Sequence, residues 1–350
     1  MKKSYIIAML LLVTAGLCAQ ETKQYKVGLI GFYNLENFYD TIDQPFVDDA
    51  EFLPKSERHY NTEVYRDKVG RLAEVLSGIG KDITPDGLSC FGVAEIENDN
   101  VLNDLVAHPK LKPSNFKIVH YDSPDSRGVD VAFLYNPKYM TVLQSRPLHV
   151  TLPVERGDSF PHQTRDVLWV TVRYMLSDTI HIFVNHWPSR RGGEEASRPL
   201  REIAAGVSRK IIDSLMVLNP ETKAVVMGDL NDDPSNTSCA KIIGAKADKE
   251  KVQPGGMFNP FWNYYKKGIG TLAYNDSWDL FDQIMISHGF LPKEQNGVFY
   301  QKALIYNRDF MVQKTGKFKG YPLRTWDGNI YNHGYSDHFP TYIVLLKAVQ

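Results

Sequence analysis

Six segments of this chain place carboxylate, amide or imidazole side chains at the edge of an apolar run. The candidates are Asn34, Glu36, Glu95, His186, Asp229, Asn231, Asp282, Asp337 and His338. A single Asn or Asp at the end of a strand is usually a turn residue that hydrogen-bonds its own backbone. Six such segments are more than turn chemistry alone explains, and we therefore predict that these side chains meet in one site.

The types of side chain in this set favour a hard divalent cation together with an anion. Carboxylates without thiols suit Mg²⁺ or Mn²⁺, whereas zinc prefers several His or Cys residues at short spacing. The sequence contains no H-E-x-x-H, no G-x-S-x-G and no glycine-rich phosphate loop with its lysine. Acids for a metal, with amides and imidazoles for an anion, predict metal-assisted hydrolysis of a phosphate ester.

Asp282 resists a purely structural explanation. It lies in the segment FDQIMIS, where Phe281, Ile284 and Ile286 are expected to be buried. A carboxylate among such residues is costly unless it has a partner. We therefore expect a charged or hydrogen-bonding partner for Asp282 from elsewhere in the chain.

Strand-like apolar segments flank the candidate residues, so strands must position the site. They include YKVGLIGFYNLENF, SCFGVAEIE, VDVAFLY, VLWVTVRYML, TIHIFVNHW, KAVVMGDLN and PTYIVLLK. Helical periodicity predicts helices over residues 62–80, 99–108 and 196–217. Because strands outnumber helices, we predict one domain over residues 24–347, with two sheets packed face to face and helices outside.

Two further segments offer cations and aromatic rings. The first follows His186 and contains Arg190, Arg191, Arg198 and Arg201. These arginines could bind a polyanion, or they could simply be solvated at the start of a helix. Residues 250–275 have little periodicity and many aromatic residues, which predicts a long surface excursion. Its rings could stack on bases, or they could pack beneath the excursion.

The first twenty residues have the composition of a secretory signal. Lys2 and Lys3 precede the apolar stretch YIIAMLLLVTAGL, and small residues surround Ala19. A cationic start, an apolar run too short to span a membrane and a small-residue cleavage point are typical of signal peptides. We expect residues 1–19 to be removed and the protein to be exported to the periplasm or the extracellular space, without stable membrane insertion.

Bulk charge and cysteine content exclude little. The whole chain has a formal net charge of −1, and loss of Lys2 and Lys3 makes it −3. A charge this small favours no polyanion, so any phosphate affinity has to be local. Export would permit Cys90 and Cys239 to form a disulfide, although two buried free thiols are the simpler expectation.

The ordered set of motifs resembles the endonuclease/exonuclease/phosphatase superfamily. NLEN, AEIEN, NHWPS, GDLND, FDQIMIS and SDH occur in this order between residues 34 and 338. Each motif alone is short enough to recur by chance, whereas the ordered set is specific. The resemblance implies an α/β four-layer sandwich with two mostly antiparallel β-sheets, helices outside and one active site at a sheet edge.

The resemblance also implies a role for each matching acid and for the last histidine. Glu95 looks like the principal ligand of Mg²⁺, with Mn²⁺ possible, and Asp337 and Glu36 match further metal-binding acids. His338 looks like the catalytic histidine, with Asp282 as its carboxylate partner.

The remaining candidates resemble residues that handle phosphate or water. Asp229 and Asn231 look like the pair that acts on the attacking water or the leaving group and steadies the phosphate. Either Asp229 or the Asp282–His338 pair would be the base. Asn34 looks like the asparagine that orients the phosphate or a metal ligand, and a contact to phosphate is implied for His186 and more loosely for Arg127. Arg190 and Arg191 are added as substrate-binding candidates because they follow His186.

We expect a monomeric enzyme that acts on a phosphate ester. A secreted endonuclease-like phosphodiesterase acting on nucleic acid is the first choice. A sphingomyelinase-like or inositol-phosphate-directed phosphoesterase is the alternative, because the sequence does not identify the organic part of the substrate. A third hypothesis is a binding protein that retains the fold but does not turn over a substrate. Completeness of the polar set argues against it, because decayed sites usually lose a metal-binding acid or the final histidine.

Overall fold

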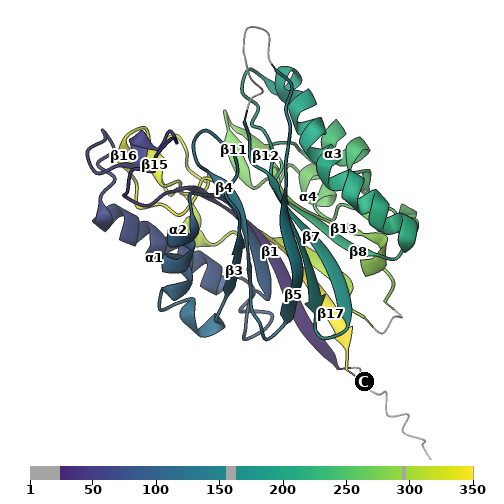
Figure 1. Cartoon of the computed structure of the whole chain (residues 1–350). Coiled ribbons are helices and arrows are strands. Elements are labelled where there is room, and N and C mark those ends of the chain that lie inside the picture. The colour runs from purple at the N-terminus through teal and green to yellow at the C-terminus, as the bar shows by residue number, and fades with distance from the viewer. Residues whose placement is uncertain (1–23, 155–162, 294–296, 350) are drawn as a thin grey trace, which may run out of the picture.

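Two large β-sheets form the centre of the molecule (Figure 1). The structure is a computed structural model, and it describes residues 24–154, 163–293 and 297–349. The expected signal segment, residues 1–19, lies outside the described residues. Within them, no helix is both long enough and apolar enough to cross a membrane.

The first sheet has six strands and the second has seven. The six-stranded sheet runs in the order β14 (Phe299–Ile305), β17 (Thr341–Ala348), β1 (Tyr25–Phe38), β2 (Cys90–Ile96), β4 (Asp130–Tyr135) and β3 (Lys117–His120). The seven-stranded sheet runs β5 (Met140–Leu148), β6 (Val167–Tyr174), β7 (Asp178–His186), β8 (Lys223–Asp229), β13 (Asp282–Ser287), β10 (Met257–Phe258) and β9 (Ala245–Lys246).

Smaller elements complete the chain. Two hairpins are formed by β11 (Leu272–Tyr274) with β12 (Ser277–Asp279) and by β15 (Trp326–Asp327) with β16 (Ile330–Tyr331). The α-helices are α1 (Thr62–Gly78), α2 (Asp99–Ala107), α3 (Glu194–Leu218) and α4 (Trp262–Lys266). Single turns of 3₁₀-helix lie at Ala50–Phe52, Lys112–Ser114, Lys249–Lys251, His288–Phe290 and Asp309–Met311, and a π-helical turn at Ser238–Ile242.

Most neighbouring strands are antiparallel, as expected. The parallel pairs are β1 with β2, β7 with β8, and the short β9 with β10. Parallel neighbours need a long crossover, usually a helix. The chain supplies α1 between β1 and β2, and α3 between β7 and β8. The carboxyl ends of β7 and β8 are therefore side by side, and the same holds for β1 and β2.

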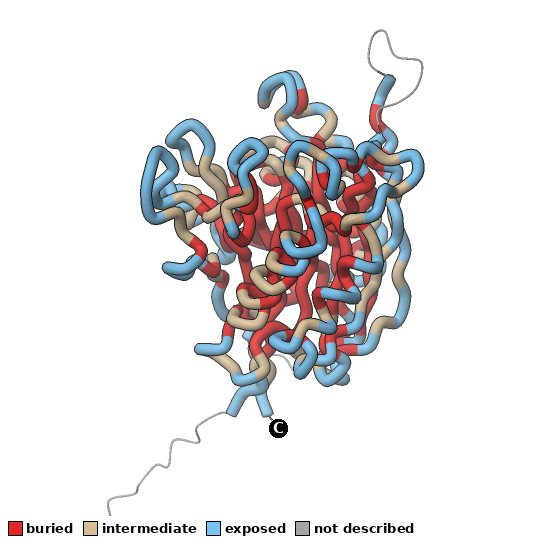
Figure 2. The backbone as a smooth tube through the Cα atoms, turned by 90° about the vertical axis from the view of Figure 1, so that its left-hand side faces the viewer, coloured by how far each residue is buried: buried red, intermediate tan, exposed pale blue. Residues whose placement is uncertain are grey.

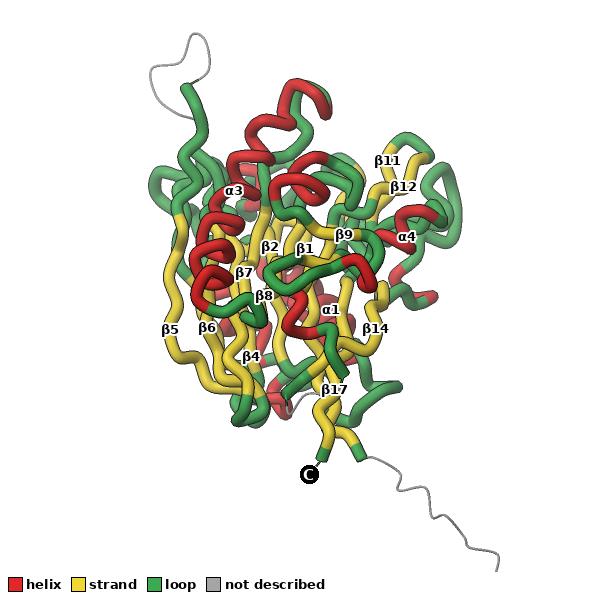
Figure 3. The backbone as a smooth tube through the Cα atoms, turned by 90° about the vertical axis from the view of Figure 1, so that its right-hand side faces the viewer, coloured by secondary structure: helices red, strands yellow, loops and turns green. Residues whose placement is uncertain are grey.

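The helices cover the outer faces of the two sheets. In Figure 1, α1 and α2 lie on one side of the strands and α3 lies on the other, and Figure 3 shows α3 against the seven-stranded sheet. Asn61 and Asn98 begin α1 and α2 by accepting hydrogen bonds from backbone N–H groups of the first turn, a strong signal for a helix start. The four-layer arrangement agrees with the prediction.

Alternation of side chains along the strands produces three layers of apolar core. On β1, Leu29 and Tyr33 face the helices α1 and α2, whereas Ile30 and Phe32 face the second sheet. On β8, Val226 faces α3 in the third layer. The central strands are buried along most of their length, as Figure 2 shows, because each sheet is covered on both sides.

The segment 250–275 differs from the expected surface excursion. Its residues Met257 and Phe258 form β10, which extends the seven-stranded sheet beside β13. Phe258 and Phe261 are buried in the core between the sheets. Most of its aromatic rings are therefore packing residues, and Phe258 and Phe261 are not available for stacking on bases. Apolar side chains without helical or strand periodicity hid this short strand.

Both expected free thiols are buried. Cys90 lies on β2 and Cys239 in the π-helical turn, and neither forms a disulfide. Burial raises the pKa of the Cys90 thiol well above its usual value, so this group is an inert core residue.

Candidate active site

Three neighbouring strands of the seven-stranded sheet bring their candidate residues to one level. His186 at the end of β7 is the register partner of Asp229 at the end of β8. Asp229 is in turn the register partner of Asp282 at the start of β13. Strand pairing alone therefore gathers three residues that lie up to 96 positions apart in the sequence.

The six-stranded sheet contributes Asn34 and Glu95 from the parallel strands β1 and β2. Regular alternation would point Glu95 to the same side as Val93, into the core beneath α1 and α2. The register shifts between Ala94 and Ile96, and Glu95 has a left-handed backbone with φ of 61°. This irregularity carries the Glu95 carboxylate out of that core and toward the other sheet. Left-handed residues other than glycine cost about 1–3 kcal/mol each and are concentrated at functional sites.

Asn34 links the two sheets through its side chain. Its Nδ2 donates to Glu95 Oε1 at 3.2 Å and to Asp229 Oδ2 at 3.0 Å. Its Oδ1 accepts from the backbone N–H of Glu36 at 2.9 Å, which fixes the orientation of the amide. The backbone N–H of Asn37 donates to the second oxygen of Glu95 at 2.9 Å. Asn34 thus holds Glu95 and Asp229 beside each other.

His338 and Asp282 form the expected pair. His338 Nδ1 lies 2.7 Å from Asp282 Oδ2, and Asp282 is fully buried. The Oγ of Ser336 accepts from the His338 backbone N–H and donates to the backbone oxygen of Asn34, which ties this loop to β1. Burial alone lowers the pKa of His338, but Asp282 and Asp229 outweigh it and raise that pKa well above its usual value.

The second nitrogen of His338 has no hydrogen bond to any described residue. His338 Nε2 lies 3.8 Å from Asp229 Oδ2 and 3.8 Å from Asp337 Oδ1. Both distances are too long for a direct hydrogen bond. The Nε2–H group therefore points toward two carboxylates and remains free to contact a bound anion.

His186 has the opposite electrostatic setting. Its Nε2 lies 3.8 Å from Glu95 Oε1 and 3.7 Å from Asp229 Oδ2, and its Nδ1 is buried without a partner among the described residues. Burial, reinforced by Arg165 and Arg127, lowers the pKa of His186 well below its usual value. His186 is therefore a neutral imidazole beside the imidazolium of His338.

The carboxylates of the site differ in proton affinity. Burial is the main cause that raises the pKa of Asp229 to about 6, and Asp282 and Glu95 add to it while His338 opposes it. Burial also acts on Glu95, but Arg127 and His338 outweigh it and lower the pKa of Glu95. At neutral pH both groups are ionised.

A metal ion fits this group of donors. Glu95, His186 and Asp229 each offer one ligand atom, and the three atoms lie within 4.8 Å of one another. The Nδ1 atom of the buried His186 also has no hydrogen-bond partner among the described residues. Carboxylate oxygens are the ligands that Mg²⁺ and Mn²⁺ prefer, and a cation would offset the concentration of negative charge.

Glu36 and Asp337 form a neighbouring pair of acids. Arg324 lies between them, with Nε 3.8 Å from Glu36 Oε1 and Nη2 3.3 Å from Asp337 Oδ2. Burial and then Asp337 raise the pKa of Glu36 to about 7. The backbone N–H of Thr325 donates to Glu36 Oε2 at 2.7 Å. Their role as metal ligands stays a prediction, since Arg324 already supplies a positive charge there.

The three candidate arginines occupy different settings. Arg127 is half-exposed, with Nε 3.6 Å from Asp125 Oδ1. Its guanidinium is close enough to Glu95 that, although burial lowers the pKa of Arg127, Glu95 and Asp125 raise it overall. Arg127 therefore lies at the site. Arg191 is exposed in the turn before α3, and it forms no hydrogen bond or ion pair with the predicted catalytic residues that the structure describes.

Arg190 is already occupied by groups of the protein. Its Nε donates to the backbone oxygen of Asn231 at 2.9 Å, and its Nη2 lies 3.2 Å from Asp233 Oδ2. Asn231 itself donates from Nδ2 to the backbone oxygen of Trp187 at 3.0 Å. Arg190 and Asn231 thus brace the ends of β7 and β8, and their direct contact with substrate stays a prediction.

The acidic residues after β8, Asp232 and Asp233, form an ion pair and a hydrogen bond with distant segments in addition to forming a turn. Asp232 is fully buried and lies 2.7 Å from Nε of the fully buried Arg201. The backbone N–H of Leu280 donates to Asp233 Oδ1 at 2.8 Å. The arginine patch expected after His186 is therefore largely neutralised, because Arg198 also pairs with Glu194.

Sequence reasoning missed three cations that support the site. They are Lys68, Arg165 and Arg324. Lys68 is fully buried in α1 and donates to the backbone oxygen of Glu36 and, at 2.9 Å, to Thr325 Oγ1. A signal was present, because helical spacing puts Lys68 on the same face as Tyr65 and Leu72.

Arg165 connects the loop of Arg127 to the end of β7. Its Nη1 lies 3.1 Å from Asp125 Oδ2, and Nε and Nη2 donate to the backbone oxygens of His186 and Trp187. No sequence pattern distinguishes Arg165 or Arg324 from surface arginines, because their partners are backbone groups and acids from distant segments.

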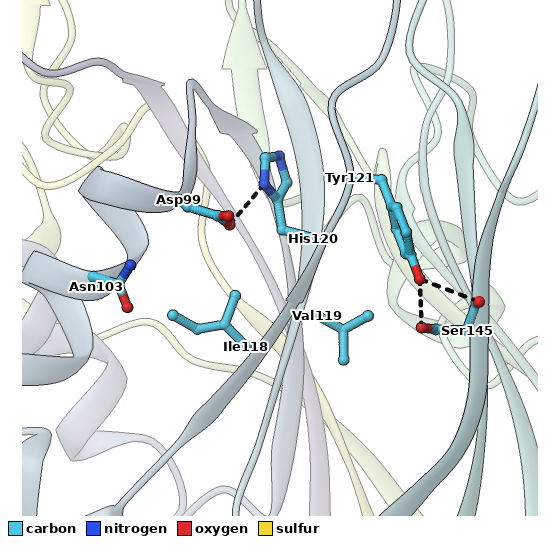
Figure 4. A pocket seen from close by; sticks show the side chains of 7 residues that line it. All are labelled: Asp99, Asn103, Ile118, Val119, His120, Tyr121 and Ser145. Atoms are coloured by element: carbon cyan, nitrogen blue, oxygen red, sulfur yellow. Dashed lines mark hydrogen bonds and ion pairs between the residues drawn. The ribbon is translucent and has the colours of Figure 1, made fainter.

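A second histidine with acidic neighbours, His120 at the end of β3, lines a hollow away from the candidate site, and Figure 4 shows it beside Asp99. Its side chain is buried, with Nδ1 2.9 Å from Asp99 Oδ1 and Nε2 3.0 Å from Asp130 Oδ2. Asp122 Oδ1 lies 4.0 Å from the same Nε2. Both ring nitrogens are occupied by carboxylates, so this cluster is a satisfied ion-pair network with no nitrogen left for a ligand.

Comparison with known proteins gives a family and a fold. The sequence model of the Endonuclease/Exonuclease/phosphatase family matches residues 29–347. No curated protein sequence matches the chain. The fold is similar to that of an endonuclease/exonuclease/phosphatase family protein from Bacteroides thetaiotaomicron, at 14% identity and a TM-score of 0.53, covering 93% of this chain and 100% of that one.

Two other solved structures show the same fold at similarly low identity. One is D. rerio TDP2 complexed with a single strand DNA product, at 12% identity and a TM-score of 0.52, covering 91% of this chain and 98% of that one. The other is a mannosyl-6-phosphatase from Bacteroides thetaiotaomicron, at 14% identity and a TM-score of 0.50, covering 92% and 100%. These likenesses show the fold alone, whereas the family match extends over nearly the whole described chain: the chain belongs to the endonuclease/exonuclease/phosphatase family of metal-dependent phosphoesterases.

Proposed function

We propose that this protein is a Mg²⁺-dependent phosphodiesterase of the endonuclease type that acts on nucleic acid. The observation that carries the proposal is the convergence of Glu95, Asp229 and His186 beside the His338–Asp282 pair. Three possible metal ligands lie next to a histidine whose outer nitrogen is free. This is the combination that metal-assisted attack of water on phosphorus requires.

Glu95 would hold the cation, with Asp229 and His186 in reach and with Asp337 and Glu36 as predicted additional ligands. A bound Mg²⁺ supplies polarisation of a nonbridging phosphate oxygen and offsets charge that builds up on the phosphate. The Glu95 carboxylate suits this role because Asn34 and the backbone of Asn37 orient both of its oxygens. Preorganisation of this kind avoids reorganisation during the reaction.

Asp229 would take the proton of the attacking water, and His338 would donate the proton to the leaving oxygen. Asp229 Oδ2 lies between the two imidazoles, 3.7 Å from His186 Nε2 and 3.8 Å from His338 Nε2. Asp282 accepts from Nδ1–H of His338, so the proton available for transfer is on Nε2. Water adds its oxygen to phosphorus, the bond to the leaving oxygen breaks, and both protons are accounted for.

His186 would help to stabilise the transition state, and Asn34 would hold Glu95 and Asp229 in place. Asn34 uses both N–H groups of its side chain for these two carboxylates, whereas His186 Nε2 lies beside them without a direct hydrogen bond. Donors whose attraction grows with the developing charge lower the barrier to the chemical step. Removal of one such donor typically costs about 100- to 1,000-fold in rate.

The test is hydrolysis of bis-(4-nitrophenyl) phosphate with and without Mg²⁺, with Glu95→Gln as the matched control. We expect metal-dependent turnover that this variant loses. Plasmid DNA, RNA, sphingomyelin and sugar phosphates, tested side by side, then identify the substrate. Metal-independent turnover, or equal rates for Glu95→Gln and the wild type, would contradict the proposal. Tight binding without turnover would indicate the non-enzymatic alternative.

A further inference from the structure

A cavity of about 370 Å³ opens beside the predicted catalytic residues. Its lining includes Arg324 and Asp337, and Asp337 Oδ1 lies 3.8 Å from His338 Nε2. The rest of the wall comes from the hairpin β11–β12 and from residues 313–332. In Figure 1 this hairpin lies at the upper edge of the sheets. A group bound in the cavity would therefore lie next to a phosphate bound at the site.

The hairpin wall is anchored to the catalytic residues themselves. Thr271, just before β11, accepts from the backbone N–H of Phe339 at 2.7 Å. The Thr271 side chain accepts from the backbone N–H of Asp282 at 3.3 Å. The start of the hairpin is therefore attached to the backbone of the Asp282–His338 pair, which suits a wall that has to position substrate.

The two walls of the cavity are joined to each other. Tyr321 OH accepts from the backbone N–H of Asp276 and donates to Asp276 Oδ1, each at 2.8 Å. The ring of Tyr321 also meets Trp278 edge-on, with centroids 5.9 Å apart. Trp278 stacks on Phe339, next to His338. These contacts connect the two walls of the cavity to each other and to the residue after His338.

Two aromatic rings in the lining are accessible to a ligand. Tyr274, from the hairpin wall, is 70% exposed, and Phe318, from the other wall, is 39% exposed with its ring centroid 5.7 Å from that of Tyr321. The ammonium of Lys317 lies 5.4 Å from the centroid of the Phe318 ring. Exposed aromatic rings grouped in a cavity are typical of a binding surface, and flat ligands stack on them.

Polar groups between the rings select the kind of ligand. Asn275 and Asn332 are among the residues that line the cavity, and the side chain of neither forms a hydrogen bond with another residue that the structure describes. A heteroaromatic base presents donors and acceptors at its edge that such amides can satisfy. An acyl chain would leave the amides facing methylene groups, which is unfavourable. The volume suits one small ligand and is too small for a duplex.

We propose that this cavity binds the nucleobase adjoining the scissile phosphate, so that the enzyme acts on nucleotide esters and single-stranded ends in preference to the interior of a duplex. This inference rests on the phosphodiesterase function proposed above. It adds Tyr274 and Phe318 as specificity-determining residues, which stack on the base, and Asn275 and Asn332, which contact its edge. None of these residues belongs to the predicted catalytic set.

Three phosphodiesters with the same 4-nitrophenolate leaving group test the proposal. Their second ester group is methyl, abasic 2-deoxyribose linked through its 5-oxygen, or thymidine linked through its 5′-oxygen. For Tyr274→Ala and Phe318→Ala we expect kcat/KM to fall about 5- to 100-fold on the thymidine ester, the range for one base–aromatic stack. The methyl and abasic esters should keep the wild-type values within about twofold. Tyr121→Ala removes a comparably exposed ring in a different hollow and is the control.

Other results in this assay would contradict either the base-binding proposal or the phosphodiesterase function. An equal loss on the abasic and thymidine esters would place a sugar ring in the cavity and overturn the assignment to a base. An equal loss on all three esters, or no loss on any, would also overturn it. Failure of the wild type to hydrolyse the methyl ester with Mg²⁺ would count against the phosphodiesterase function itself.

A binding measurement separates the two proposals without turnover. Calorimetric titration of the metal-free protein with thymidine 5′-monophosphate should give tighter binding than titration with abasic deoxyribose 5-phosphate. Tyr274→Ala and Phe318→Ala should remove this difference. Equal affinities for the two ligands in the wild type would reject the base pocket even if the enzyme is active.

Discussion

His338 and His120 are both buried imidazoles with carboxylates around them, yet they have different prospects for chemistry. His120 uses both ring nitrogens, one for Asp99 and one for Asp130. His338 uses only Nδ1, for Asp282, and its Nε2 stays 3.8 Å from two further acids. The first arrangement satisfies the ring completely. The second leaves the Nε2–H group of His338 without an acceptor, facing the carboxylates of Asp229 and Asp337.

The two clusters also differ in where their members come from. The acids around His120 are Asp99 on α2, Asp122 in the loop after β3 and Asp130 on β4, all between residues 99 and 130. The neighbours of His338 come from β8, β13 and the loop before β17, and through Asp229 it is linked to β1, β2 and β7. A group of polar residues near a histidine is therefore not enough to indicate a site. The informative features are an unused ring nitrogen and acids that face it without touching it.

The largest expected effect is that of His338→Ala. This change removes the proton donor to the leaving oxygen, and we expect kcat to fall by about 10³- to 10⁴-fold. The matched change His120→Ala should leave kcat within about threefold. Activity on a thymidine dinucleotide, whose alkoxide leaving oxygen needs a proton, measures both, with circular dichroism to check folding. A wild-type rate for His338→Ala would show that the His338 cluster is no more important for catalysis than the His120 cluster.

Asp282→Asn is expected to reduce kcat by about 10²- to 10³-fold. The neutral amide no longer stabilises the imidazolium of His338 or fixes its orientation, while its size is nearly unchanged. Asp130→Asn makes the same change beside His120 and should affect stability without affecting kcat. Similar losses of kcat in both variants would show that the effect is not specific to the His338 pair.

Glu95→Gln is expected to weaken Mg²⁺ binding by about 10- to 100-fold or more, since changes that only support a ligand already have this effect. A thermal shift on adding Mg²⁺ measures this directly, because a ligand that binds the folded state raises Tm. The wild type should show a saturable increase in Tm, and Glu95→Gln should need a higher concentration for the same increase. Asp122→Asn, beside His120, should leave the Mg²⁺ response of the wild type unchanged. Equal responses in Glu95→Gln and the wild type would assign the ion to other residues.

The smallest effect concerns the pH dependence of stability through His120. Burial alone lowers the pKa of His120, but hydrogen bonds and charges of Asp130 and Asp99 raise it overall from 6.5. A folded-state pKa above the unfolded one means that the stabilisation is complete below about pH 6.5 and is lost as the pH rises through the folded-state pKa. Between pH 5.5 and pH 9, the wild type should lose about 1–2 kcal/mol more unfolding free energy than His120→Gln.

Urea unfolding at the two pH values gives this comparison. Parallel losses in the wild type and His120→Gln would show that the ion-pair network around His120 contributes nothing that depends on its proton. The activity of His120→Gln at neutral pH should match the wild type, since this histidine lies outside the candidate site.

Much of the fold could be predicted from sequence because it depends on local patterns. Alternation along β1 and β8 and helical spacing in α1 and α3 specify which faces are apolar, and asparagines mark two of the helix starts. The short strand β10 could not be found this way. Met257 and Phe258 have no pattern of their own, and only pairing with β13 makes them a strand.

The candidate site, like the fold, could be predicted from sequence only in part. Residue types and motif order were enough to select Asn34, Glu95, His186, Asp229 and His338, which the structure brings together. They were not enough to separate Arg127, which lies at the site, from Arg190, which is paired with Asp233. Two arginines look alike in sequence, and their partners decide whether a charge is available.

By itself, the sequence determined the kinds of side chain and the strands that carry them, because hydrophobic periodicity and side-chain chemistry are local properties of the chain. Only the tertiary structure decided which groups face each other. The shifted register at Glu95, the arginine between Glu36 and Asp337, and the aromatic cavity beside Asp337 all depend on contacts between distant segments. Such contacts form only when strands pair and the two sheets pack.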